Sequence, residues 1–179
     1  RIVRRLSFFL RRLRYDLPDI EEDVWLAFLA AVIFSSADWV QHATLDKLHL
    51  SKSNREIVEK ALDDLGTAEN AIGGKGMRSY EEIYLFLRDA PYVTALFWAA
   101  ATQQWRVRRR ILLYLTRLHR VNPILMGRDL VELGYPKGPL IGKILEELLL
   151  ARLRGEVETR EDEIKWVKSN YPLYVLKKG

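Results

Sequence analysis

Apolar residues recur at intervals of three and four along most of this sequence, and this spacing constrains the fold more than any other feature. In the first segment they stand at Leu6, Phe9 and Leu13, with arginines between them. Such residues share one face of a helix, whereas a half-buried strand needs apolar residues at every second position. That alternation is nearly absent here. We therefore predict an all-α fold, with a multi-helix body, a helical tail subdomain and no sheet.

A glycine-rich stretch at residues 73–76 divides the sequence. Glycines followed by lysine can bind phosphate in a P-loop, but that motif follows a strand and has Ser or Thr after its lysine. Here Lys75 is followed by another glycine, so we interpret the stretch as a connection. With a boundary between residues 66 and 80, we predict a helical body over residues 1–78 and a helical tail over residues 79–179.

Residues that cap helix ends mark several boundaries. A Ser or Thr followed three residues later by an acid satisfies free amides of a first helical turn. Such pairs predict a helix over residues 54–65, a helix opening near residue 80 and a last helix ending near residue 169. The pairs are Ser53 with Glu56, Ser79 with Glu82, and Thr159 with Asp162. Acids at residues 19–23 similarly suit the start of a helix that runs to Ile33.

Positive charge is concentrated in two blocks of the sequence. The net charge of +5 is modest, but residues 1–14 carry six arginines and no acid, and residues 90–128 carry seven arginines and no acid. Residues 129–179 are balanced, with nine acids and nine bases. This distribution is typical of a face that binds a polyanion, although solvated helix faces paired with acids elsewhere would give the same pattern. Charge alone leaves both interpretations open.

The densest positive charge lies on a helix expected over residues 105–120. Arginine suits phosphate because its planar guanidinium donates two parallel hydrogen bonds. Trp105 and Tyr114 could stack on bases or sugars, but we prefer the interpretation that both pack in the core or at its boundary. The candidate nucleic-acid-binding residues of this cluster are Arg106, Arg108, Arg109 and Arg110.

Residues 127–142 read as a short helix, a tight turn and the start of a second helix opened by Pro139. The first amides of a helix point outward without partners and can bind a phosphate. The alternative is that Gly138 only caps the helix and that Gly142 permits close helix packing. The amides expected to bind are those of Gly138, Leu140 and Ile141, and the charged side chains beside them are Arg128, Lys137 and Lys143.

Residues suited to catalysis or metal binding form no recognisable pattern. There is no cysteine, and the three histidines, His42, His49 and His119, stand at no metal-binding spacing. No Asp-x-Asp on a strand indicates magnesium binding, and no GxSxG motif indicates a serine nucleophile. We therefore predict no catalytic residue, no metal ligand and no cofactor in this chain, which is not expected to be an enzyme by itself.

The sequence favours a cytoplasmic protein without a membrane span. Its longest apolar stretch, Val24 to Phe34, is too short to cross a bilayer and lacks the flanks of a signal peptide. The lack of cysteine agrees with a reducing compartment. The chain begins with Arg1 rather than Met, which suggests a part of a longer protein, although processing would give the same start.

The segment from Gly127 to Val167, GRDLVELGYPKGPLIGKILEELLLARLRGEVETREDEIKWV, resembles the tail of class II (bacterial-type) tRNA nucleotidyltransferases and poly(A) polymerases. The family pattern reads Gly, Asp-Leu, Leu-Gly, Gly-Pro, Ile-Gly and Ile-Leu, then Gly-Glu and an acidic helix. Residues 48–62 resemble the family's body segment more weakly. The matching residues are Gly127, Asp129, Leu130, Leu133, Gly134, Gly138, Pro139, Ile141, Gly142, Ile144, Leu145, Gly155 and Glu156.

This resemblance implies how the chain would act. The family has a head with metal-binding carboxylates, a neck that selects the incoming base, and a body and tail that clasp tRNA. Neither the head motifs nor the neck motif Glu-Asp-x-x-Arg occurs here. The chain would therefore be the C-terminal body and tail, with residues 1–14 at the neck–body junction. It would hold tRNA or other RNA for 3′-end nucleotide addition by the head and neck of the same polypeptide, with Mg²⁺ and ATP or CTP bound in the head.

Two kinds of alternative stay open. The parent protein could add CCA, CC or A to tRNA, or polyadenylate RNA, since the discriminating residues would lie in the head and neck. The chain could instead be a helical protein–protein interaction or dimerisation module that binds no RNA, which an apolar patch formed by exposed Trp39, Trp98 or Trp166 would favour. A homo-oligomer is compatible with either alternative, and no membrane partner is expected.

Overall fold

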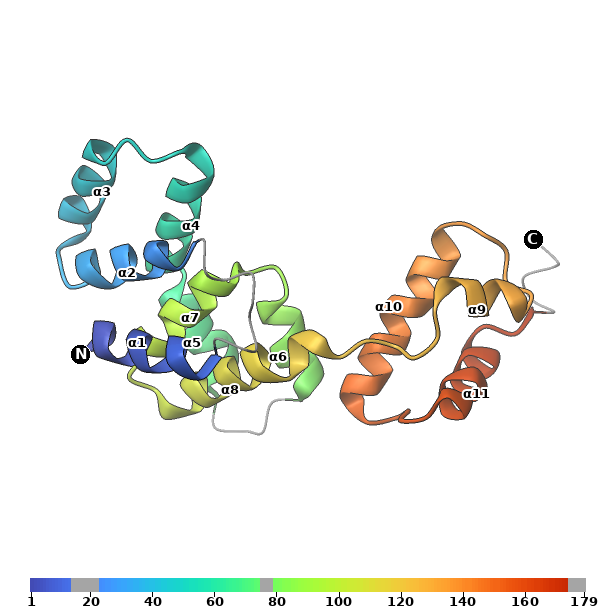
Figure 1. Cartoon of the computed structure of the whole chain (residues 1–179). Coiled ribbons are helices and arrows are strands. Elements are labelled where there is room, and N and C mark those ends of the chain that lie inside the picture. Colours follow the sequence, from blue (N-terminus) through green and yellow to red (C-terminus); the bar gives the residue numbers. More distant parts are fainter. Residues whose placement is uncertain (14–22, 75–78, 174–179) are drawn as a thin grey trace. The chain divides into compact units, whose positions relative to one another are not determined.

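The computed structural model of the protein describes residues 1–13, 23–74 and 79–173, and these residues form helices and connections without any strand. The prediction of an all-α fold is confirmed. Two compact units make up the chain (Figure 1). Unit 1 comprises Arg1–Arg78 and Glu82–His119, and unit 2 comprises Ser79–Glu81 and Arg120–Gly179.

Unit 1 contains most of the helices. In chain order they are α1 (Ile2–Leu13), α2 (Val24–Ile33), α3 (Asp38–Lys47), α4 (Lys52–Asp63), α5 (Leu65–Gly73), α6 (Tyr80–Leu87), α7 (Tyr92–Ala101), α8 (Trp105–Thr116) and the 3-10 turn η2 (Leu118–Arg120). The first two residues of α6 and the last residue of η2 belong to unit 2.

The core of unit 1 is built around α7. Every residue of this helix from Val93 to Ala101 is buried, as expected of a helix that is apolar on all sides. Helices α1, α2, α4 and α8 pack around it (Figure 1). The polar edge of Trp98, in the middle of α7, is satisfied because its indole N–H donates to the Ala61 carbonyl of α4 at 2.9 Å.

Because α7 needs this surrounding shell, the two units divide the chain at a different place from the predicted one. The prediction separated residues 1–78 from residues 79–179. The units instead keep most of α6 and all of α7 and α8 with the N-terminal helices, and the main division falls between His119 and Arg120. Moving α7 into a separate unit would expose its apolar surface to water.

The helices that lie wholly within the described part of unit 2 are α9 (Gly127–Glu132), α10 (Pro139–Arg154) and α11 (Arg160–Asn170). The core of unit 2 gathers residues from all three helices and from the connections between them, including Leu130, Ile144, Leu148 and Val167. Tyr135 lies buried in the connection between α9 and α10, and its hydroxyl donates to the Tyr171 carbonyl at 2.8 Å. That bond ties the end of α11 to the α9–α10 turn.

Several predicted helix ends are confirmed and others are wrong. The box formed by Thr159 and Asp162 opens α11, Pro139 opens α10, and α6 begins directly after Ser79. The cap of α4 is wrong by two residues, because the Ser51 hydroxyl, and not that of Ser53, accepts from the Asn54 amide. The helix expected over residues 105–120 ends at residue 116 and continues as the 3-10 turn. The expected start of α2 at residues 19–22 lies outside the described residues.

Candidate nucleic-acid interface

The four arginines of α8 do not share one face of the helix. Arg106 and Arg109 are exposed, whereas Arg108 and Arg110 are partly buried. Residues three apart on a helix are neighbours on its surface, while adjacent residues point about 100° apart. The sequence RVRRR therefore sends two guanidinium groups to solvent and two toward the interior of unit 1.

Arg108 satisfies backbone carbonyls at the C-terminal end of α7. Its Nε donates to the Ala99 carbonyl at 3.0 Å, and its Nη2 donates to the Thr102 carbonyl. Arg5 of α1 reaches the same helix end, with Nη1 3.1 Å from the Ala100 carbonyl and 3.4 Å from that of Thr102. Burial, reinforced by the neighbouring Arg5 guanidinium, lowers the pKa of Arg108 from its usual value. The last carbonyls of a helix lack intrahelical partners and carry partial negative charge, so these two cations stabilise α7.

Arg110 has an equivalent position at the C-terminal end of α5. Its Nη1 donates to the carbonyls of Ile72 and Gly74, the latter at 3.1 Å. The interior roles of Arg108 and Arg110 were not predicted, because both appeared in the sequence only as members of a charge cluster. Their guanidinium groups already have acceptors inside the protein, so within this cluster Arg106 and Arg109 are the better placed to meet a phosphate.

The two aromatic residues of α8 have opposite environments. Tyr114 is only 3% exposed and packs near Tyr84, Tyr92 and His119, and burial raises its pKa to about 12. Trp105 is 58% exposed, and the guanidinium carbon of Arg106 lies 5.1 Å from the centre of its ring. Core packing is therefore the role of Tyr114 but not of Trp105.

The α9–α10 turn places a second group of exposed basic residues in unit 2. Arg128, Lys137 and Lys143 are all exposed, and the Lys143 ammonium lies 3.9 Å from a carboxylate oxygen of Glu147. An exposed pair at this distance contributes little to stability and is easily exchanged for another anion. These side chains lie on α9, in the turn and in the first turns of α10, as the sequence predicts.

Gly138 is the N-cap of α10, with a φ of 141° that residues with a side chain rarely adopt. The capping role considered for it is therefore correct. Close helix packing at Gly142 is not, because a Cβ there would meet nothing within 4 Å. Of the three amides expected to bind an anion, that of Ile141 donates to the Gly138 carbonyl at 3.1 Å. The amides of Gly138 and Leu140 have no acceptor in the part of the chain that the structure describes.

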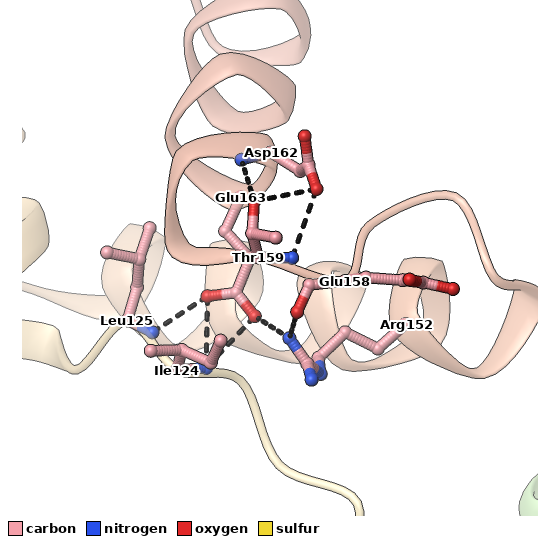
Figure 2. Close-up of polar contacts among 7 residues, drawn as sticks. All are labelled: Ile124, Leu125, Arg152, Glu158, Thr159, Asp162 and Glu163. Atoms are coloured by element: carbon pink, nitrogen blue, oxygen red, sulfur yellow. Dashed lines mark hydrogen bonds and ion pairs between the residues drawn. The ribbon is translucent and has the colours of Figure 1, made fainter.

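Glu163 is a structural residue that sequence reasoning missed. An acid in the first turn of a helix ordinarily complements the helix dipole from the solvent, but the side chain of Glu163 is fully buried. As Figure 2 shows, the carboxylate accepts from the amides of Ile124 and Leu125, the latter at 2.7 Å. Nη1 of Arg152, on α10, donates to it at 2.7 Å. One side chain thus joins α10, α11 and the segment that leads into α9.

The remaining titratable residues form no candidate metal centre in the described ranges, where no group of three or more His, Cys, Asp or Glu could hold an ion. His42 and His49 are exposed. Nδ1 of His119 lies 2.9 Å from the Tyr114 carbonyl. Within the same ranges, no helix is both long and apolar enough to cross a membrane.

Comparison with known proteins gives one informative similarity. The chain is 33% identical over 160 residues to an A-adding tRNA nucleotidyltransferase of Geobacter sulfurreducens (strain ATCC 51573 / DSM 12127 / PCA). The aligned region covers 84% of this chain but only 18% of that relative. No family model matches the chain, and no solved structure matches it. The similarity supports the resemblance to tRNA nucleotidyltransferases and a link to tRNA processing.

Proposed function

We propose that this chain is the helical, RNA-holding part of a tRNA nucleotidyltransferase and that it binds tRNA while another domain extends the 3′ end. The observation that carries the proposal is the 33% identity over 84% of the chain to an A-adding enzyme. Because the chain spans about 18% of that relative, nucleotide addition would be carried out by head and neck domains elsewhere in the polypeptide. Among CCA, CC, A and poly(A) addition, the name of the relative favours A addition.

The distribution of exposed cations supports RNA as the partner. Unit 1 presents Arg106 and Arg109 on α8, and unit 2 presents Arg128 and Lys137 around the α9–α10 turn. Guanidinium and ammonium groups at the surface can neutralise phosphates and release their counterions without the cost of desolvating a buried charge. Two separate basic surfaces suit a long, folded polyanion such as tRNA better than a small anionic ligand.

Magnesium and nucleotide would be bound outside this chain under the proposal. Two-metal and single-metal nucleotidyl transfer both need closely spaced carboxylates, and the described residues offer no such group. The role of this chain would be to orient the RNA, which contributes to the rate by positioning rather than by chemistry.

The salt dependence of tRNA binding tests the proposal at residue level. We expect Arg106→Ala combined with Arg109→Ala to weaken tRNA binding and to reduce the slope of log affinity against log salt by about 2, since each lost phosphate contact removes about 1. Lys60→Ala, an exposed lysine on α4, is the matched control and should leave the slope nearly unchanged. An unaltered slope in the double variant would exclude α8 from the RNA-binding surface.

One observation favours the alternative of a protein interaction module. Trp39 is 75% exposed on α3, and Trp25 and Val32 of α2 are 43% and 64% exposed. Of the other two tryptophans considered for such a surface, Trp98 is buried in α7 and Trp166 is half-buried. If the chain self-associates through this region, sedimentation velocity should show a dimer that Trp39→Ser converts to a monomer.

A further inference from the structure

Two helices of unit 1 bring arginines to the same point. Arg5 of α1 and Arg108 of α8 both donate to the Thr102 carbonyl at the end of α7, and α1 and α8 both pack against α7. The flank of α1 that carries Arg5 and the flank of α8 that carries Arg108 therefore border the same helix end. The carboxylate of Glu69 also points to this end, where it accepts from the Thr102 hydroxyl at 2.5 Å.

An exposed aromatic residue lies beside each of these arginines. Phe8 follows Arg5 by three residues and is 62% exposed, and Trp105 precedes Arg108 by three residues and is 58% exposed. Residues three apart on a helix are surface neighbours. Phe8 therefore lies next to Arg5 on α1, and Trp105 lies next to Arg108 on α8, while both arginines donate to the end of α7.

The surroundings of both rings are strongly cationic. Phe8 has Arg4 four residues before it and Arg11 and Arg12 three and four residues after it, and all three are exposed. Trp105 contacts Arg106, and the exposed Arg109 lies one turn further along α8. Neither α1 nor α8 contains an acidic residue. The exposed rings are therefore surrounded by groups that bind phosphate and not by a continuous apolar surface.

We propose that Phe8 and Trp105 are stacking platforms for unpaired RNA bases, with the arginines around them binding the adjacent phosphates. This α1–α8 face, defined by Phe8, Trp105 and their neighbouring arginines, would bind single-stranded RNA in preference to a duplex. Exposed aromatic rings stack on any base whose faces are free, but in a duplex both faces of each base are covered by its neighbours. The inference rests on the proposed RNA-binding function and specifies which part of an RNA this face takes.

The test compares two RNA probes and three substitutions in the 179-residue chain. Fluorescence anisotropy would give the affinities for a labelled oligoadenylate and for a blunt RNA duplex of the same length. Phe8→Ala and Trp105→Ala are each expected to weaken oligoadenylate binding by about five- to a hundredfold, the usual effect of removing one stacking residue. Duplex binding should not change. Trp39→Ala, which removes a more exposed tryptophan from α3, is the matched control and should alter neither affinity.

A second measurement follows Trp105 in the unaltered chain, and the conservative variant Trp105→Phe serves to assign its signal. With 5-fluorotryptophan incorporated, the ¹⁹F resonance of Trp105, assigned through Trp105→Phe, should shift on adding oligoadenylate and stay in place on adding duplex. A Trp105→Phe chain should also keep most of its oligoadenylate affinity, since a ring is retained.

The outcomes separate this inference from the proposed function. If the alanine variants bind oligoadenylate as well as the parent chain, or lose duplex affinity equally, the stacking role is refuted while RNA binding itself stands. If an oligoglutamate peptide binds the parent chain as tightly as oligoadenylate and loses affinity with the same substitutions, the face recognises acidic protein and not RNA. If the parent chain binds neither tRNA nor oligoadenylate, the proposed function fails and the inference with it.

Discussion

The substitution Glu163→Gln should destabilise unit 2 more than any other change of similar size. The buried carboxylate accepts hydrogen bonds from two backbone amides and from Arg152, whose side chain is 21% exposed. Glutamine has nearly the same shape but no charge, and its amide nitrogen cannot accept. Arg152 would keep its charge in a mostly buried position without a compensating anion. The one oxygen that remains could not accept from both the Leu125 amide and Arg152, which bond to different carboxylate oxygens.

The expected magnitude approaches the whole stability of the unit. Breaking a buried ion pair by removing one partner costs about 3–5 kcal/mol. Unit 2 has roughly 60 residues, for which a stability of about 3–9 kcal/mol is typical. The variant should therefore be marginally folded or unfolded in unit 2. Glu161→Gln is the control, because this exposed acid occupies the same first turn of α11 and its loss should cost under about 1 kcal/mol.

The tryptophan distribution allows each unit to be followed separately. Trp166 is the sole tryptophan of unit 2, and the other four lie in unit 1. In a chain labelled with 5-fluorotryptophan, urea titration followed by ¹⁹F NMR should show the Trp166 transition of Glu163→Gln at much lower urea, with the four unit 1 resonances unchanged. A Trp166 transition within experimental error of the parent chain would refute the structural role assigned to Glu163.

Three further predictions follow from the positions of arginines, glycines and carboxylates. Arg108→Ala should destabilise unit 1 by about 2–4 kcal/mol, because it removes two charge-assisted hydrogen bonds to backbone carbonyls. Arg109 is exposed, so Arg109→Ala should cost under about 0.5 kcal/mol in the same urea titration. Gly138→Ala should destabilise unit 2 by about 1–3 kcal/mol through its positive φ, whereas Gly142→Ala, in helical conformation and open space, should stabilise it by about 0.5–1 kcal/mol. Hydrogen bonds depress the pKa values of three carboxyls in unit 2, so the ionised carboxyls stabilise the unit above their ordinary pKa range, and this stability is lost as pH falls below about 4. The Trp166 resonance should therefore report unfolding in acid before the unit 1 resonances do. Simultaneous unfolding of the two units would contradict this expectation. The carboxyls and their partners are Asp129 with Arg160, Glu156 with Arg154, and Asp162 with Thr159.

The helical class and the punctuation of unit 2 could be predicted because they depend on local spacing. Pro139 and the Thr159–Asp162 box act within one helical turn, and the structure places each where the sequence indicated. The cap of α4 was misplaced because Ser51 and Ser53 are both suitable. Local preference alone does not decide between two serines so close together.

The extent of unit 1 could not be predicted because it depends on tertiary packing. The glycine-rich sequence at residues 73–76 predicts a connection, but connections occur within compact units as well as between them. What assigns α7 to the first unit is its burial on all sides by α1, α2, α4 and α8. The sequence shows that α7 is apolar all round, but not which helices cover it.

The charged residues show the same distinction between composition and environment. The sequence identifies a dense arginine cluster on α8, yet only the fold shows that Arg108 and Arg110 bind the carbonyl ends of α7 and α5. Glu163 is another such residue, because nothing local distinguishes it from the exposed Glu161 two positions earlier. In each case the partner is distant in sequence, so a count of charges cannot separate binding residues from structural ones.

The most direct test of the central claim is to measure the affinity of this chain for deacylated tRNA and for duplex DNA of equal charge at two salt concentrations. We expect tighter binding to tRNA, with an affinity that falls by about a factor of ten or more between low and physiological salt, because several phosphates are neutralised. Equal affinity for the two nucleic acids, or no binding at low salt, would contradict a role in holding tRNA.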